Sequence, residues 1–206
     1  LDTIEAKCVH FVEIDTLTGV LNDMLAQMCG VSPLASFSKQ ILGSAAGIAQ
    51  KYHYDKAHSQ HVETLACRLF DATAAFLDLE QRDRLILRIA SILHDIGMFV
   101  SEYAHHKHGA YLVRWSELIG LSDADRELVS QIVRYHRKSA PMPHHSEFMT
   151  LPAPDRVRVT KLAALLRIAD ALERRHDQSV KTVHVELRDA ELDIAAETRS
   201  DLTVEH

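Results

Sequence analysis

The sequence feature that most constrains the fold is an apolar helical run that ends in a histidine and an aspartate. Apolar residues recur along it at intervals of three and four, at Leu85, Ile89, Ile92, Leu93 and Ile96. This spacing predicts a helix with one buried face, and Gly97 suits the left-handed residue that follows a helix C-terminus. His94 and Asp95 would then lie at a buried helix end, where an imidazole and a carboxylate are natural ligands for a divalent metal. A metal site needs further ligands from elsewhere in the chain.

Similar apolar spacing predicts helices on both sides of this run. Ser36 is a good N-cap for a helix that reaches about Tyr52, and a second helix begins near His58 and continues through Phe76. After Gly97 the sequence predicts a loop that holds His105, His106 and His108. A helix through Leu112, Trp115 and Leu118 is then expected to end at Gly120.

The second half of the chain continues the helical pattern and then changes its period. Ser122 and Asp125 resemble a capping box for the next helix, residues 139–154 hold four of the five prolines and read as a loop, and a long helix is expected over about 155–175. Residues 182–187 and 192–196 alternate apolar and polar side chains, which predicts a β-hairpin. The expected fold is therefore mainly α, with a small C-terminal hairpin.

These patterns suggest three parts. Residues 36–180 form the helical domain, and residues 181–206 form the hairpin appendage. Residues 1–35, with a helix-like stretch over 17–28, are a linker or the remnant of a preceding domain. Because Leu1 is not a start methionine, we expect the chain to have been cut from something longer.

The composition restricts the classes of function. With 206 residues, 47% hydrophobic and 25% charged, the chain has the composition of a soluble globular protein, and no apolar run is long enough to cross a bilayer. The net charge of −6 argues against a nucleic-acid surface. Three scattered cysteines read as reduced thiols of a cytoplasmic protein. The 14 histidines gather mainly in 53–61, 105–108 and 136–145, which favours metal binding, although exposed histidines are the simpler alternative.

Two residues are candidate partners for His94 and Asp95. His58 lies at the start of a helix, one turn from the apolar Val62, and Asp170 lies in the almost wholly apolar stretch 166–172. A carboxylate buried there is costly unless it is paired or bound to a metal. The alternative partner for Asp170 is an arginine such as Arg167.

The order His58, His94-Asp95, Asp170 resembles the H…HD…D signature of the HD superfamily. The resemblance implies an HD-domain helical bundle that binds a divalent metal (Mn, Mg, Fe, Ni or Zn), with His94 and Asp95 at the catalytic centre. His105 falls where bimetallic members carry a ligand for a second metal. His136 falls at a histidine pair of those members, although Tyr135 replaces the first histidine of that pair.

Some features of catalytic HD proteins are missing. Many carry a lysine after His-Asp-x-Gly, where this chain has Met98. There is no Gly-Tyr-Pro motif after His136, which disfavours a cyclic-di-GMP phosphodiesterase, and the glutamate-aspartate pair of (p)ppGpp hydrolases is also missing. Met98 argues against efficient hydrolysis by the domain itself but leaves the expected metal site intact.

A closer resemblance covers roughly Ser36 to Ala196. Four motifs agree in order with the C-terminal domain of the exopolyphosphatase / guanosine pentaphosphate phosphatase (Ppx/GppA) family, namely 93–100, 105–113, 134–138 and 162–173. The resemblance implies a parent enzyme that acts on polyphosphate or pppGpp through an N-terminal actin-like phosphatase domain, for which this chain has no glycine-rich phosphate loops. The present domain would then help to bind substrate, form a homodimer, or both.

Four basic residues could meet a phosphate group on such a substrate: Lys107, Arg134, Arg137 and Lys138. Three interpretations follow. The domain is a metal-binding part of a polyphosphatase, or a metal-dependent hydrolase in its own right that acts on a nucleotide or other phosphoester, or a helical domain whose histidines merely satisfy one another. The complete set of signature residues argues against the third. No membrane or specific nucleic acid is expected as a partner.

Overall fold

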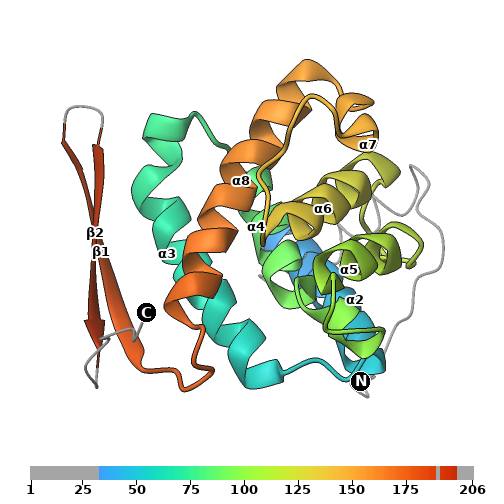
Figure 1. Cartoon of the computed structure of the whole chain (residues 1–206), viewed down its shortest axis with the longest axis horizontal. Coiled ribbons are helices and arrows are strands. Elements are labelled where there is room, and N and C mark those ends of the chain that lie inside the picture. The colour runs from blue at the N-terminus through green and yellow to red at the C-terminus, as the bar shows by residue number, and fades with distance from the viewer. Residues whose placement is uncertain (1–32, 189–190, 199–206) are drawn as a thin grey trace, which may run out of the picture.

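The computed structural model describes residues 33–188 and 191–198, which form a helical body with a two-stranded sheet on one side (Figure 1). The long helices are α2 (Pro33–Lys51), α3 (Lys56–Leu77), α4 (Gln81–Leu93), α5 (His105–Arg114), α6 (Asp123–Tyr135) and α8 (Ala153–Leu172). Shorter helical segments are the 3-10 helix η1 (Ile96–Phe99) and α7 (Ser146–Met149), and the strands are β1 (Val180–Arg188) and β2 (Glu191–Thr198). The mainly α fold with a C-terminal hairpin is confirmed. The predicted helix over 17–28 lies outside the described residues.

The core lies where α3, α4, α6 and α8 meet. The apolar faces that the sequence predicted are buried there, including Leu65 of α3, Leu93 of α4, Ile132 of α6 and Leu166 of α8. Asp55 caps α3 by accepting a hydrogen bond from the His58 N–H, and Ser122 caps α6 by accepting one from the Asp125 N–H. These contacts fix the helices whose ends carry the candidate ligands.

Two predicted boundaries near His94 were wrong. Helix α4 ends at Leu93 and is followed by η1, so the run does not continue as one helix to Gly97. The histidines expected in a loop begin α5 instead, because the left-handed Ala104 turns the chain directly into a helix without a side-chain cap. Capping side chains are the usual signal of a helix start, and none precedes His105.

Helix α5 also ends earlier than predicted. It stops at Arg114, and Trp115 is 73% exposed rather than part of the core. The Ser116 hydroxyl donates a hydrogen bond to the Leu112 carbonyl at 2.7 Å. Side-chain hydrogen bonds of this kind compete with the backbone hydrogen bonds of a helix. Leu118 is buried as expected.

The hairpin pairs β1 with β2 in antiparallel register, with Val183 opposite Ala196 and Val185 opposite Ile194, and an irregularity between Val180 and Thr182. Strand β1 lies beside α3 (Figure 1) and buries Val180 and Val183 in the main core. The hairpin therefore packs against the helical body through one of its faces. No helix among the described residues is long and apolar enough to cross a membrane.

Candidate metal centre

The four signature residues converge in the structure although they come from three separate stretches of the chain. The Nε2 atoms of His58 and His94 lie 3.2 Å apart. Asp170 Oδ1 lies 3.6 Å from His58 Nε2 and 3.7 Å from His94 Nε2. Asp95 Oδ2 lies 3.5 Å from His94 Nε2 and 3.8 Å from His58 Nε2. We call these residues the first ligand group: His58, His94, Asp95 and Asp170.

A second ligand group lies on the other side of the same aspartate. Asp95 Oδ1 is 3.4 Å from His105 Nε2, at the start of α5, and 3.6 Å from His136 Nε2, directly after α6. The second ligand group is therefore Asp95, His105 and His136, whose ligand atoms lie within 4.8 Å of one another. Asp95 offers one carboxylate oxygen to each group, which is the arrangement of a bridging ligand.

Backbone carbonyls fix the histidine rings in the orientation that metal binding requires. The Nδ1 atoms of His94, His105 and His136 lie 2.8, 3.0 and 2.7 Å from the carbonyls of Ser91, Glu102 and Val133. Because a carbonyl only accepts, Nδ1 must carry the proton, and in the neutral ring Nε2 keeps a lone pair. All three Nε2 atoms face the carboxylates.

Two of these Nε2 atoms lack the partners that buried polar groups normally have. Among the described residues, Nε2 of His105 and Nε2 of His136 are buried without a hydrogen-bond partner. The Nε2 atoms of His58 and His94 face each other at 3.2 Å. Their lone pairs would repel each other at this distance unless a proton or a cation lies between them. Imidazole nitrogens with carboxylate oxygens suit Mn, Fe, Ni or Zn, so the residues present fit a divalent metal.

The two groups differ in their electrostatics. Burial alone would lower the pKa of His94, but the adjacent carboxylates of Asp95 and Asp170 raise it to about 9. For His136, burial and the positive charge of His94 lower the pKa to about 3. Burial would raise the pKa of Asp170, but hydrogen bonds from His58 and His94 hold it below the usual range. The first ligand group therefore carries more negative charge than the second.

Gly97 fits the close contact between η1 and α5. A Cβ at this position would lie 2.0 Å from the His105 carbonyl oxygen and 2.4 Å from the Gly109 nitrogen. The predicted reason for this glycine was wrong, because positive φ angles occur among the described glycines at Gly120 and not at Gly97. Close backbone approach, and not a left-handed turn, requires glycine here. The contact also sets the position of His105.

Sequence reasoning missed the role of His176. Its side chain is 45% exposed, and its ring stacks on His58 at 3.6 Å between centroids with an interplanar angle of 7°. Its Nδ1 lies 3.1 Å from Asp55 Oδ2, and Asp55 in turn caps the helix that carries His58. His176 follows α8 by only a few residues, so its proximity to Asp170 in sequence was the one available signal.

A half-buried histidine, His61, and a buried glutamate, Glu173, form a pair beside the first ligand group. Glu173 is 1% exposed, and its Oε2 lies 3.5 Å from His61 Nε2. The other oxygen of Glu173 accepts hydrogen bonds from the backbone and side chain of Gln178. This pair was not singled out from the sequence.

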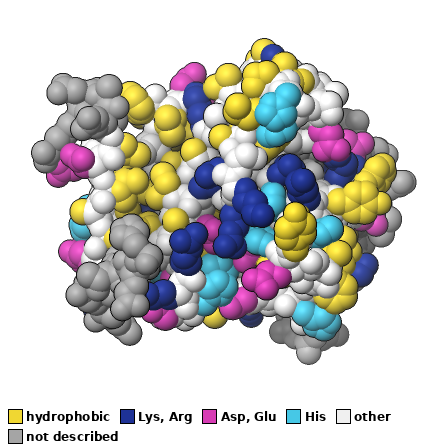
Figure 2. Space-filling model, viewed as in Figure 1, with side chains coloured by type: hydrophobic (Ala, Val, Ile, Leu, Met, Phe, Trp, Pro, Cys, Tyr) yellow, Lys and Arg dark blue, Asp and Glu magenta, His cyan; other side chains and the backbone are white. Residues whose placement is uncertain are grey.

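Asp170 does not pair with Arg167, which was the alternative to a role as a metal ligand. The ion-pair contacts of Asp170 within the described ranges go to His58 and His94, whereas Arg167 donates to the Lys138 carbonyl at 3.1 Å. Of the four predicted phosphate contacts, Lys107, Arg137 and Lys138 are exposed and Arg134 is half-buried. Figure 2 shows arginine and lysine side chains gathered across the middle of one face, with histidines beside them.

Fold and site together define a helical domain with a buried histidine–aspartate cluster suited to divalent metal. The family model of Ppx/GppA phosphatase, domain III, matches residues 42–205. The chain belongs to the Ppx/GppA phosphatase family, and the described helical body with its hairpin corresponds to that domain. The resemblance that the four sequence motifs carried is thereby confirmed.

Curated relatives agree with this placement. The chain is 29% identical over 124 residues to a guanosine-5'-triphosphate,3'-diphosphate pyrophosphatase of Pseudoalteromonas atlantica, covering 58% of the chain and 24% of the relative. A protein of the same name from Aeromonas hydrophila is 29% identical over 141 residues, covering 66% and 27%. Another from Pseudoalteromonas translucida is 26% identical over 153 residues, covering 73% and 30%. The matches therefore span about a quarter to a third of the length of these relatives.

Proposed function

We propose that this domain binds divalent metal through the two ligand groups and contributes to the binding of a phosphate-containing substrate by a Ppx/GppA-type phosphatase. The observation that supports the proposal best is the convergence of four buried imidazole Nε2 atoms on the two oxygens of Asp95. Two of these Nε2 atoms, in His105 and His136, have no hydrogen-bond partner among the described residues. Buried polar atoms without partners are costly, so a cluster of them around one carboxylate calls for a cation.

Each ligand has a distinct part in this proposal. His58, His94, Asp95 and Asp170 would hold the first ion, and His105 and His136 would hold a second with the remaining oxygen of Asp95. When bound, such ions would activate water and polarise a phosphoryl oxygen. The Ser91, Glu102 and Val133 carbonyls keep the rings in the tautomer that offers Nε2. His94 and Asp95 are then the residues at the reaction centre.

The basic residues supply the substrate side of the proposal. Arg137 and Lys138 follow His136 directly, so that a phosphate near the second ligand group would meet their cations. Lys107 lies in the first turn of α5, and Arg134 lies in the last turn of α6. The substrate we propose is polyphosphate, pppGpp or another nucleotide.

The alternative is that the domain hydrolyses a phosphoester by itself. The presence of both ligand groups around Asp95 favours this version. Met98 favours the supporting role, because this residue is 45% exposed at the position where many catalytic HD proteins carry lysine. In the supporting version, catalysis belongs to an actin-like phosphatase domain of the parent protein, and the present domain contributes to substrate binding or to a homodimer.

Metal content and turnover distinguish these versions. We would measure the metal content of the purified chain, and then phosphate release from nucleotides, pppGpp and polyphosphate with added Mn²⁺. Turnover that Asp95→Ala abolishes would make the domain an enzyme, whereas bound metal without turnover would support a binding role. A chain that takes up no metal even after soaking would refute the proposal.

A further inference from the structure

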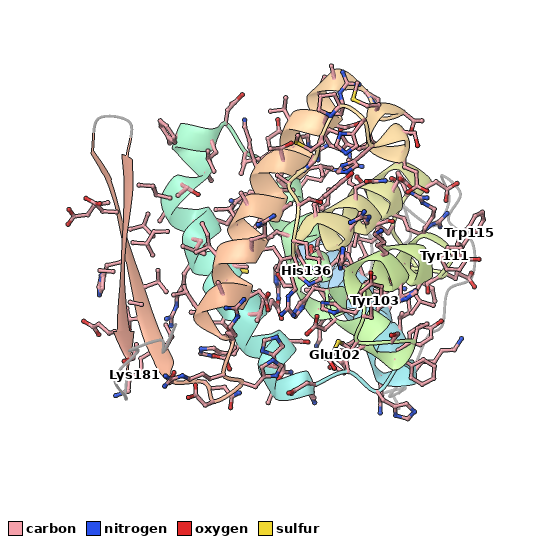
Figure 3. The ribbon with its side chains drawn as sticks, viewed as in Figure 1. Glu102, Tyr103, Tyr111, Trp115, His136 and Lys181 are labelled. Atoms are coloured by element: carbon pink, nitrogen blue, oxygen red, sulfur yellow. The ribbon has the colours of Figure 1, made fainter. Side chains whose placement is uncertain are left out.

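A pocket beside the second ligand group has the properties of an anion site that does not depend on metal. It has a volume of about 340 Å³ and is lined by residues 102–106 together with Arg137 and Lys138. Glu102 and Tyr103 lie close to His136 in Figure 3, whereas Tyr111 and Trp115 point away from this region along the outer side of α5. His105 belongs both to the pocket wall and to the second ligand group.

The pocket is built around an uncapped helix N-terminus. Ala104 precedes α5 in a left-handed conformation, with a φ of 57° and no side-chain cap. The backbone N–H of Lys107 bonds to the Ala104 carbonyl at 2.8 Å, whereas the His106 N–H has no backbone acceptor in the described part of the chain. A free N–H at the positive end of a ten-residue helix attracts an anion.

His106 provides an independent sign of a missing ligand. Its side chain lines the pocket but is only 3% exposed, and its Nδ1 is buried without a hydrogen-bond partner among the described residues. An imidazole buried to this extent normally has its ring nitrogens satisfied. A ligand oxygen in the pocket is a natural partner for such a ring.

The two cations of the lining, Arg137 and Lys138, are available for binding. Within residues 33–188 and 191–198 Arg137 forms no ion pair, and Lys138 lies 5.3 Å from the ring centroid of Tyr103 rather than against a carboxylate. Glu102 is the one acidic residue of the lining. Two cations, a helix N-terminus and one carboxylate leave the pocket with a net preference for anions.

We propose that this pocket is a phosphoryl-binding subsite, formed by the N-terminus of α5, His106, Arg137 and Lys138, that holds its anion without metal. The inference deepens the proposed function, on which it rests for its biological meaning. A substrate with two neighbouring phosphoryl groups would place one at the metal cluster and the next in the pocket. The affinity of the pocket for an anion nevertheless requires no ion in either ligand group.

Calorimetric titration of the chelator-treated chain with inorganic pyrophosphate at low ionic strength tests the subsite. We expect saturable binding that weakens as salt is added, because the contacts are largely ionic. Arg137→Met and Lys138→Met should each weaken it about tenfold or more, as expected for a lost charge-assisted hydrogen bond. Lys39→Met, which removes an exposed lysine from α2 outside the pocket, is the matched control and should bind as the parent does.

Two further variants separate binding from folding. Glu102→Gln should tighten pyrophosphate binding severalfold, because it removes the only carboxylate of the lining and leaves its backbone carbonyl in place. His106→Phe should keep the ring volume, and a thermal melt checks its fold, but it should weaken binding. No binding by the chelated chain, or equal binding by the Arg137 and Lys138 variants and the control, would overturn the subsite. Pyrophosphate binding by a chain that takes up no metal would refute the proposed function alone.

Discussion

The two ligand groups on either side of Asp95 use the same residue types but differ in charge. The first combines two histidines with the carboxylates of Asp95 and Asp170, while the second combines two histidines with one oxygen of Asp95. The difference is visible in the pKa values, about 9 for His94 and about 3 for His136. Ligand charge largely decides how strongly a site holds a divalent cation. We therefore expect the first group to fill before the second.

The largest effect should come from the residue that the two groups share. Asp95→Ala removes both carboxylate oxygens at once, and leaves His105 and His136 without any acidic partner at the site. We expect the variant to lose both ions, as measured by elemental analysis after gel filtration. A variant that retained one ion per chain would show that Asp95 does not bridge the groups.

Variants of the first group should separate it from the second. His94→Ala and Asp170→Ala each remove a ligand of the first ion only, and we expect each to lose the tightly bound metal. His105→Ala is the matched comparison, because it removes one imidazole from the second group and should leave the first ion in place. Stoichiometric tight metal in either of the first two variants would show the ligand assignment to be wrong.

Gly97→Ala should disturb the geometry of the second ligand group by displacing the backbone at His105. The added Cβ would collide with the His105 carbonyl, so η1 and α5 must move apart. Overpacking of this kind costs about 1–3 kcal/mol, which a thermal or urea unfolding experiment would detect. We also expect weaker binding of the second ion, as in His105→Ala. Gly47→Ala is the control, because a Cβ added at this helical glycine has no atom within 4 Å beyond its own stretch of helix backbone.

The contrast between the groups also explains how much the sequence could predict. His58, His94, Asp95 and Asp170 were predicted as ligands from their apolar surroundings, which helix periodicity indicates, and from the resemblance of their order to the HD signature. The two-stranded hairpin and the start of α6 could also be predicted, because the alternation of apolar and polar residues and helix capping are local signals. Local patterns therefore predicted the fold class, and they also led to the main candidate ligands.

Features that depend on contacts between distant segments could not be predicted from the sequence. The collision that requires Gly97 arises where η1 meets α5, and the sequence alone suggested a left-handed turn. The stacking of His176 on His58 joins residues that are 118 positions apart in the chain, and no sequence motif indicates it. Helix α5 was missed at its start because Ala104 is not a capping residue. In each case tertiary packing decided the outcome, which single-sequence propensities do not describe.

Acidity should affect the two ions differently. The pKa of His94 is about 9, so at pH 7 its ring carries an extra proton in the metal-free chain. Binding of the first ion must then release that proton. Affinity for the first ion should then rise about tenfold per pH unit toward pH 9 and level off above it. His136, with a pKa of about 3, is already neutral and adds no such slope for the second ion. Calorimetry in buffers of different ionisation enthalpy would count the protons, and a first ion that releases none would contradict this reading.

The smallest effect should come from His176, which contacts the candidate ligand His58 but belongs to neither ligand group. His176→Ala removes the ring that stacks on His58 and the hydrogen bond to Asp55, so the His58 ring gains freedom on one face. We expect the first ion to bind a few times more weakly, less than the about 10–100-fold typical of outer-shell partners, because His176 is 45% exposed. His176→Phe keeps the stacked ring without the Asp55 bond and should recover most of the affinity if stacking matters more. Recovery by His176→Gln instead would assign the effect to the hydrogen bond, and unchanged affinity in all three variants would show that the first group does not depend on this cover.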